Sequence, residues 1–205
     1  MAGLGTLIGA LWWRKNPSAC PYSQRVFIEL PHPGITRGRL IEILEPRAGE
    51  RVLEVGPGTG YYTFEMAGRL DGGQVDLFDI QQEMLDHVMR EANRRGVTNV
   101  QPALGDAQAL PYSDDSFDAV VLITVLGEIP DQDRALSEIA RVLRPGGRLI
   151  VGEMLFDPHV VTSGKLRERG ARAGLSFVRR VGSPLAFFAR LEKPPVAPPV
   201  APQHA

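Results

Sequence analysis

The chain has 205 residues, a formal net charge of −1 and 43% hydrophobic residues. These values predict one globular domain with a sizeable core, and they argue against a nucleic-acid-binding protein, which usually carries an excess of basic residues. The single cysteine, Cys20, excludes an internal disulfide and a zinc site built from several cysteines. We therefore expect a cytoplasmic protein that does not bind nucleic acid.

The first expected element is a short helix in the apolar run at residues 3–13. This run is shorter than the roughly 20 residues that span a bilayer, and the basic pair Arg14 and Lys15 follows it, whereas a secretory signal begins with basic residues. The helix would pack on the domain or on a second subunit of a homodimer. The alternative is a peripheral membrane contact through residues 3–15.

Residues 1–35 as a whole are expected to form an N-terminal helix and arm, because residues 16–35 are rich in proline and turn-forming residues. Thr36 then predicts the N-cap of the first helix of the domain. The domain itself is expected to span residues 36–192. Residues 193–205 are rich in proline and are expected to be a disordered tail.

From residue 51 onward, short apolar runs alternate with segments of helical periodicity. The expected strands are residues 51–55, 74–80, 99–104, 117–126, 148–155, 175–183 and 185–193. The expected helices are residues 62–70, 81–96, 131–143 and 164–174. Near-continuous apolar strands that alternate with helices indicate a doubly wound α/β fold, with a mostly parallel sheet covered on both faces. The last two strands predict an antiparallel hairpin at the C-terminal end of the domain.

The segment Arg51–Thr63, RVLEVGPGTGYYT, places Gly56, Gly58 and Gly60 directly after a predicted strand. A glycine-rich turn at the carboxyl end of a parallel strand lets the backbone approach a ligand closely. Tyrosines follow Gly60 where a phosphate-binding Walker loop has lysine and then serine or threonine, so that loop is excluded. The G-x-G-x-G spacing also differs from the G-x-G-x-x-G of dinucleotide-binding folds.

Two aspartates follow the next two predicted strands. Asp79 lies at the end of the second strand, and Asp106 follows the third in the segment GDAQALP. A carboxylate can accept hydrogen bonds from both ribose hydroxyls of an adenosine, and another can accept from the adenine amino group. The alternatives are that Asp79 caps the next helix and that the glycines are merely steric.

Four segments of the chain resemble the class I S-adenosylmethionine (SAM)-dependent methyltransferases of the ubiquinone and menaquinone biosynthesis type. They are VLEVGPGTG, DIQQEML, GDAQALPYSDDSFDAVV and EIARVLRPGGRLIV, in the order of the family, between Arg51 and about Glu153. The resemblance implies a seven-stranded, Rossmann-like methyltransferase fold that binds SAM and releases S-adenosyl-L-homocysteine. It also implies that the N-terminal arm covers the active site, as in many relatives.

The resemblance further implies roles for individual residues. The glycine loop would contact the methionine part of SAM, Asp79 the ribose, and Ile80 the adenine. Asp106 would face the adenine amino group, and Glu54 would organise the loop or reach the amino-acid end. Thr124–Val125 would border the sulfonium and the acceptor. The implied cofactor-binding residues are Glu54, Gly56, Pro57, Gly58, Thr59, Gly60, Asp79, Ile80, Gly105, Asp106, Ala107, Thr124 and Val125.

The loop after the fourth strand reads TVLGEIPD. It lacks the Asn/Asp-Pro-Pro-aromatic motif of enzymes that methylate exocyclic amines of nucleic-acid bases. It also departs from the family by having Gly127 and Glu128 where many relatives carry histidine, so no histidine-based mechanism is carried over from them. A hydroxyl acceptor needs a general base. The candidates are Glu128, His32, which lies between two prolines in an expected exposed turn, His159 and Tyr22.

A hard-cation site is an alternative for the residues around the fifth strand. Asp131, Glu153, Asp157 and His159 could form one, but capping or solvated roles are expected for them, and no metal site is predicted.

The sequence therefore predicts a SAM-dependent methyltransferase that acts on a small or amphiphilic acceptor. The expected reaction is O-methylation of a hydroxyl, and a looser resemblance to small sugar methyltransferases suggests a saccharide. The alternatives are a phospholipid N-methyltransferase, a quinone C-methyltransferase and a non-catalytic SAM-binding regulatory subunit.

Overall fold

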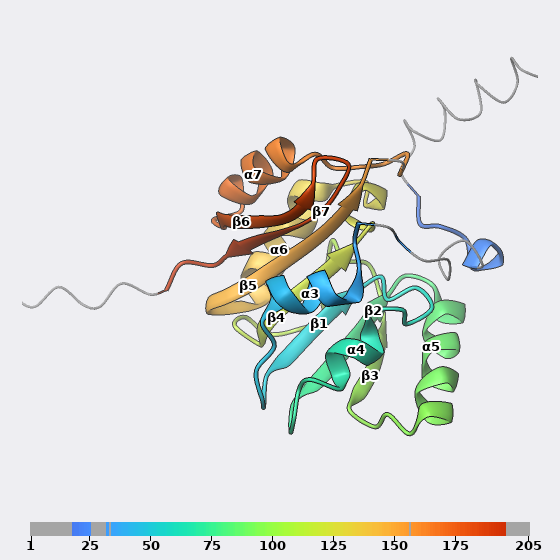
Figure 1. Ribbon diagram of the computed structural model, residues 1–205. Coiled ribbons are helices and arrows are strands. Elements are labelled where there is room, and N and C mark those ends of the chain that lie inside the picture. Colours follow the sequence, from blue (N-terminus) through green and yellow to red (C-terminus); the bar gives the residue numbers. More distant parts are fainter. Residues whose placement is uncertain (1–17, 26–31, 33, 156, 196–205) are drawn as a thin grey trace, which may run out of the picture.

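The computed structural model describes residues 18–25, 32, 34–155 and 157–195 (Figure 1). The helix predicted at residues 3–13, with its expected membrane or subunit contact, lies outside these ranges, as does the predicted tail from residue 196 onward. In the described ranges no helix is both long and apolar enough to cross a membrane.

The strands of the described ranges form one sheet in the order β3-β2-β1-β4-β5-β7-β6. Their bounds are β1 Arg51–Val55, β2 Gln74–Asp79, β3 Val100–Leu104, β4 Phe117–Ile123, β5 Leu143–Met154, β6 Ser176–Ser183 and β7 Ala186–Glu192. Strands β1 to β5 pair in parallel, whereas β7 runs antiparallel to both β5 and β6. The predicted seven-stranded, mostly parallel sheet with a C-terminal antiparallel hairpin is confirmed.

Helices cover both faces of this sheet (Figure 1). The helical elements are η1 Tyr22–Gln24, α3 Arg37–Leu44, α4 Thr63–Ala67, α5 Gln82–Arg95, η2 Leu126–Glu128, α6 Gln132–Val142 and α7 Ser163–Arg172. Apolar side chains of α3, α4 and α5 belong to one buried cluster, and those of α6 and α7 belong to the other. Within β4, Val120 packs in the α6 cluster and Val121 in the α3 cluster. The central strands are therefore buried on both faces, which explains their continuous apolar sequences.

Three predicted helix ends are confirmed by their caps. The hydroxyl of Thr36 accepts a hydrogen bond from the backbone N–H of Arg39 at the start of α3. The carboxylate of Asp131 does the same for Arg134 in α6. Gly96 ends α5 in the left-handed conformation.

Other predicted ends are wrong. Helix α4 is shorter than the predicted 62–70, and β4 ends at Ile123 because Thr124 has a φ of 56°, outside the extended region. The domain also continues through Lys193, which was expected to begin the tail. The backbone N–H of Lys193 donates a hydrogen bond of 2.9 Å to the carbonyl of Gly147.

A buried ion pair fixes α3 to the sheet. The guanidinium of Arg148 donates to both carboxylate oxygens of Glu50, at 2.9 and 2.6 Å. It also donates to the carbonyls of Leu44 and Glu45 at the end of α3, which a helix leaves without internal partners. Because the cavity residues His32 and Ile35 directly precede α3, this attachment helps to place one wall of the cavity described below.

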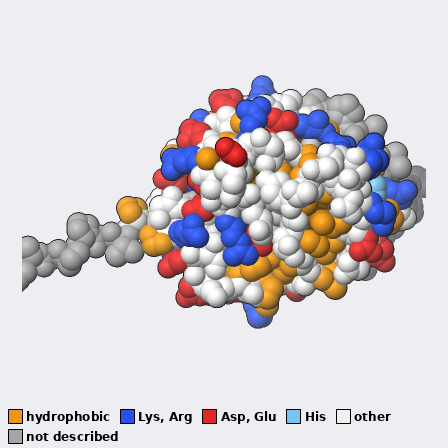
Figure 2. Space-filling model, turned by 90° about the horizontal axis from the view of Figure 1, so that it is seen from below, with side chains coloured by type: hydrophobic (Ala, Val, Ile, Leu, Met, Phe, Trp, Pro, Cys, Tyr) orange, Lys and Arg blue, Asp and Glu red, His pale blue; other side chains and the backbone are white. Residues whose placement is uncertain are grey.

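Basic and acidic side chains are interspersed around an apolar area on the face that Figure 2 shows. Many of the arginines are paired: Arg94 and Arg95 both contact Glu91 on α5, and Arg172 contacts Glu168 on α7. Such exposed pairs contribute little to stability. The expectation that the protein does not bind nucleic acid stays a prediction.

Candidate active site

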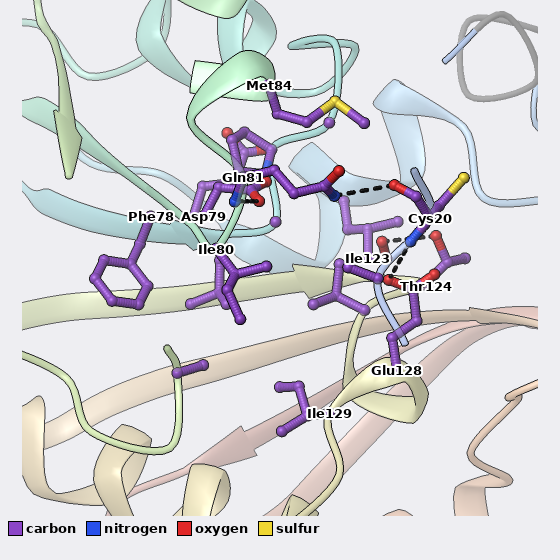
Figure 3. A pocket seen from close by; sticks show the side chains of 18 of the residues that line it. Cys20, Phe78, Asp79, Ile80, Gln81, Met84, Ile123, Thr124, Glu128 and Ile129 are labelled. Atoms are coloured by element: carbon purple, nitrogen blue, oxygen red, sulfur yellow. Dashed lines mark hydrogen bonds between the residues drawn. The ribbon is translucent and has the colours of Figure 1, made fainter. Parts of the chain in front are cut away.

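A cavity of about 540 Å³ lies at the carboxyl ends of the parallel strands, where the strand order reverses between β1 and β4. Ligands of open parallel α/β sheets bind at this position. The residues that follow β1, β2, β3 and β4 line one part, here named the strand-end half: residues 54–58, 78–81, 105–108 and 123–125. The other part, the loop half, is lined by residues 18–20, 32, 128–130 and 157–159 (Figure 3).

All predicted cofactor-binding residues except Thr59 and Gly60 line the cavity. Thr59 is buried, and a Cβ at Gly60 would contact the side chains of Phe64 and Val88. The steric explanation therefore holds for Gly60, whose neighbours are packing residues of α4 and α5.

Gly56 brings the glycine loop against the turn after β4. Its φ is 68°, and a Cβ at this position would collide with the side chain of Val125. Both conditions require glycine. The absence of a side chain leaves the backbone of this residue in the cavity wall, where a ligand can approach it.

Glu54, a residue of β1, stabilises the glycine loop. Its side chain is buried, and its Oε2 accepts a hydrogen bond of 2.5 Å from the hydroxyl of Thr63, the first residue of α4. Burial raises the pKa of Glu54 to about 8. The bond ties β1 to α4 across the glycine loop, which favours the loop-organising role among the two predicted for Glu54.

Asp79 ends β2 in the cavity wall. Its Oδ1 accepts a hydrogen bond of 2.8 Å from the backbone N–H of Gln81, and burial raises its pKa to about 6. The residue at the N-cap of α5 is Gln81, and no side chain caps that helix. Asp79 thus closes the turn before α5, and the alternative that it caps the helix is not observed.

Asp106 and Ile80 lie in the same wall. Oδ1 of Asp106 accepts hydrogen bonds from the backbone and side-chain amides of Gln108, at 2.9 and 3.0 Å. Ile80 is 59% exposed, which is unusual for isoleucine and gives the wall an apolar surface beside the two aspartates.

Five carboxyl groups line the cavity, and its lining, as far as the structure describes it, contains no lysine or arginine. The carboxyl residues are Glu54, Asp79, Asp106, Glu128 and Asp157. An acidic wall with apolar sections suits a ligand that carries positive charge and an aromatic base. The sulfonium, ammonium and adenine of SAM have these properties, so the residues fit the predicted cofactor.

Thr124 is strained at the junction of the two halves. A φ of 56° is rare for a β-branched residue, and such outliers concentrate at functional sites. Its backbone N–H donates to the carbonyl of Gly152 at 2.8 Å, which fixes the turn against β5. The sequence placed Thr124 in the site but carried no sign of this conformation.

Gly127 holds the two loops of the loop half together. A Cβ at this residue would collide with the backbone carbonyl of His159. The departure from the family pattern at Gly127 thus lets the loop at residues 157–159 pack directly on η2. In that loop, Oδ1 of Asp157 accepts a hydrogen bond of 2.7 Å from the backbone N–H of His159.

Glu128 is the most perturbed carboxyl group of the loop half. Burial, and then the charge of Asp157, raise its pKa to about 8. Glu153 lies behind the loop, 1% exposed, where burial raises its pKa to about 8 as well. Its Oε2 accepts a hydrogen bond from the N–H of Val161, while its Oε1 has no partner in the described ranges.

His32 lines the cavity, but the expectation that it lies in an exposed turn is wrong. Its imidazole is half-buried against Tyr61 and Tyr62, with ring centroids 5.2 and 6.1 Å away. Burial lowers the pKa of His32 and so favours the neutral ring. Of the other candidate bases, Glu128 and His159 also line the cavity.

Tyr22 is not part of the cavity lining that the structure describes. Its hydroxyl lies 3.3 Å from Nδ1 of His87 on α5, so it is directed away from the cavity and its candidacy as a base is not supported. His87 is half-buried.

Sequence reasoning missed several residues of the cavity wall. Residues 18–20 approach from the arm, and Gln81 joins them to the strand-end half through hydrogen bonds. The apolar side chains of Phe78, Met84 and Ile129 complete the wall. Gln81 had a sequence signal in its position directly after Asp79 and Ile80, and residues 18–20 lie in the arm that was expected to cover the active site. In the described ranges, no group of three or more His, Cys, Asp or Glu side chains is arranged to hold a metal ion.

Residues 52–147 match the family model described as a methyltransferase domain. Relatives include the ubiquinone/menaquinone biosynthesis C-methyltransferase UbiE of Teredinibacter turnerae, 43% identical over 115 residues, which cover 55% of this chain and 46% of that protein. The chain thus spans about half the length of the curated relatives it matches.

Solved structures share the fold at low sequence identity. A SAM-dependent methyltransferase from Aquifex aeolicus superimposes with a TM-score of 0.73 at 20% identity, covering 85% of this chain and 100% of that one. The [4+2]-cyclase SpnF gives 0.70 at 22% identity, covering 78% and 80%. The chain therefore shares the fold of these solved structures. The match of residues 52–147, just under half of the chain, to the methyltransferase-domain model confirms the predicted resemblance.

Proposed function

We propose that this chain is a SAM-dependent methyltransferase whose acceptor is a small or amphiphilic compound with a hydroxyl group. The observation that carries this proposal is the half-buried carboxyl group of Glu128, which lies in the same cavity as the residues that fit SAM. Its pKa of about 8 suits a general base that works near neutral pH.

SAM supplies an electrophilic methyl group when bound. Asp79 and Asp106 would accept hydrogen bonds from its nucleoside, and Glu54 keeps the glycine loop in place through Thr63. Glu128 accepts the proton of the acceptor hydroxyl. Alignment of the acceptor hydroxyl with this methyl group would provide much of the rate enhancement.

Two candidate functions differ in the acceptor atom that receives the methyl group, which is oxygen in one and carbon in the other. In the first, the deprotonated oxygen attacks, and the product is a methyl ether. In the second, the acceptor is a phenol or quinol whose ring carbon attacks after the hydroxyl is deprotonated. The similarity to UbiE, named a ubiquinone/menaquinone biosynthesis C-methyltransferase, favours this second candidate. No observation favours a saccharide over another hydroxyl compound.

The test uses the intact chain, SAM labelled in its methyl group, and three acceptors: a simple quinol, a monosaccharide, and vesicles that contain phosphatidylethanolamine. Mass spectrometry of the labelled product distinguishes O-, C- and N-methylation. Label in an ether or on a quinol ring supports the proposal. Label in phosphatidylethanolamine alone contradicts it. Tight SAM binding without transfer to these acceptors or to any fraction of a cell extract points to a regulatory subunit.

A further inference from the structure

Gln81 links the two halves of the cavity through a short segment of the arm, Ser18–Tyr22. Its side-chain amide nitrogen donates a hydrogen bond of 3.0 Å to the carbonyl of Cys20, and its amide oxygen accepts one of 3.2 Å from the N–H of Tyr22. Both polar ends of one side chain are thus engaged by the backbone of the same segment. Figure 3 shows Gln81 reaching toward Cys20.

The same segment contacts the opposite wall. The backbone N–H of Cys20 donates a hydrogen bond of 3.4 Å to Oε2 of Glu128 (Figure 3). Cys20 therefore stands between the turn that carries Asp79 and the loop that carries the proposed base. This contact is long, so it depends on how firmly the segment is held from the other side.

An additional contact attaches the segment to α5. The hydroxyl of Tyr22 lies 3.3 Å from Nδ1 of His87 on this helix, and within the arm the guanidinium of Arg25 lies over the ring of Tyr22 at 4.6 Å. Gln81 directly precedes α5, so the described arm residues are fastened along the beginning of this helix.

We infer that Gln81 is a positioning residue that holds Ser18–Tyr22 as a wall of the cavity and thereby keeps Glu128 sequestered from solvent. Loss of two hydrogen bonds is enough to change the equilibrium for release of the segment by about tenfold or more. The effect on turnover rests on the proposed function. The attachment of the segment does not, and it can be measured separately.

The single cysteine provides that measurement, because Cys20 lies within the attached segment and is half-buried. Burial, with the charges of Glu128 and Asp157, raises the pKa of its thiol, so both low exposure and low thiolate content slow its alkylation. Release of the segment would remove both effects. The rate of reaction with iodoacetamide, followed by mass spectrometry of the intact chain, therefore reports the attachment.

Gln81→Leu removes both hydrogen bonds at similar size, and we expect it to accelerate alkylation of Cys20 about tenfold. Gln82→Ala is the matched control: the neighbouring side chain is exposed and donates to Asp86, and its rate should stay within about twofold of the wild type. Repeating the assay at low urea separates local release, which is insensitive to urea, from global unfolding. An unchanged rate in folded Gln81→Leu overturns the inference.

Turnover gives the second readout. Because burial is the largest cause of the raised pKa of Glu128, Gln81→Leu should shift the pH dependence of kcat/KM to lower pH, with a higher KM for the acceptor. If Gln81 had only a structural role, its substitution would lower the stability of the fold without shifting the pH dependence of kcat/KM. If alkylation accelerates while no acceptor is ever methylated, the attachment stands and the proposed function fails.

Discussion

The two halves of the cavity are built in different ways. In the strand-end half, each aspartate is held by a residue two positions further along: Asp79 by Gln81 and Asp106 by Gln108. In the loop half, Asp157 is held in the same way by His159, but Glu128 is contacted by a distant segment, since Cys20 lies 108 residues away in the chain. One half is therefore assembled within single strand–turn units, whereas the other exists only after the whole domain has folded.

The difference extends to the charges. In the strand-end half, burial raises the pKa of Asp79 to about 6, and the hydrogen bond from Gln81 opposes this rise. In the loop half, burial and the charge of Asp157 raise the pKa of Glu128 to about 8, and no arginine or lysine of the described lining offsets this charge. The comparison teaches that a half whose aspartates suit binding faces a half in which Glu128 can take up a proton.

The Glu128→Gln variant tests most directly whether the proton is taken up in the loop half. Gln keeps the size of the side chain and an oxygen that can accept from Cys20, but it cannot take up a proton. We expect kcat to fall about 100-fold or more, with SAM affinity nearly unchanged, because the base lies outside the strand-end half. Steady-state kinetics and calorimetry measure the two quantities. Glu168→Gln, on the exposed face of α7, is the control; equal rates for both variants would place the base elsewhere.

The opposite pattern is expected for Asp79→Ala. Loss of this carboxylate leaves the ribose hydroxyls of SAM without their acceptor, so SAM affinity should fall about 10- to 100-fold. Titration calorimetry checks this value. Asp86→Ala removes an exposed carboxylate of α5 and should leave affinity unchanged. If Asp79→Ala binds SAM as the wild type does, the strand-end half has been assigned to the wrong ligand.

The sequence predicted the strand-end half because its determinants are local. Glycine spacing after a strand, and a carboxylate at the end of the next one, follow from the periodicity of single α/β units. The sheet with its terminal hairpin was predictable for the same reason, since apolar runs mark buried strands. Thr59 and Gly60 are the two predicted cofactor-binding residues that do not line the cavity. Thr59 is buried, and Gly60 packs against side chains of α4 and α5.

The loop half was predicted only as a set of candidates. Glu128, His32 and His159 do meet in one cavity, but Tyr22 turns toward His87, a contact that no periodicity could reveal. The burial of His32 against Tyr61 and Tyr62 likewise depends on tertiary packing. The sequence also gave no reason for glycine at position 127, where many relatives carry histidine. The structure gives one, because a Cβ there would collide with the carbonyl of His159.

The pH dependence of turnover sharpens the comparison between the halves. Glu128 must be ionised to accept a proton, so kcat/KM measured with limiting SAM should rise about tenfold per pH unit below pH 8 and level off above it. Asp157→Asn removes the neighbouring charge and retains an acceptor for the N–H of His159, so it should shift the curve to lower pH. A profile that is flat between pH 6 and 8, or a shift in the other direction, would contradict this account.

The smallest expected effect concerns Glu153 and stability. Its folded-state pKa of about 8 exceeds the unfolded value of 4.5, so between these values the folded chain binds more protons than the unfolded chain. The stabilisation from protonated Glu153 is therefore complete below pH 4.5 and is lost as the pH rises toward 8. Glu153→Gln should remove about 1 kcal/mol per pH unit of this dependence, measured by urea unfolding between pH 5.5 and 7.5. Glu54 and Glu128 have the same sign, so part of the slope should remain in the variant. Equal slopes for Glu153→Gln and the wild type would mean that Glu153 does not hold a proton behind the loop half at neutral pH.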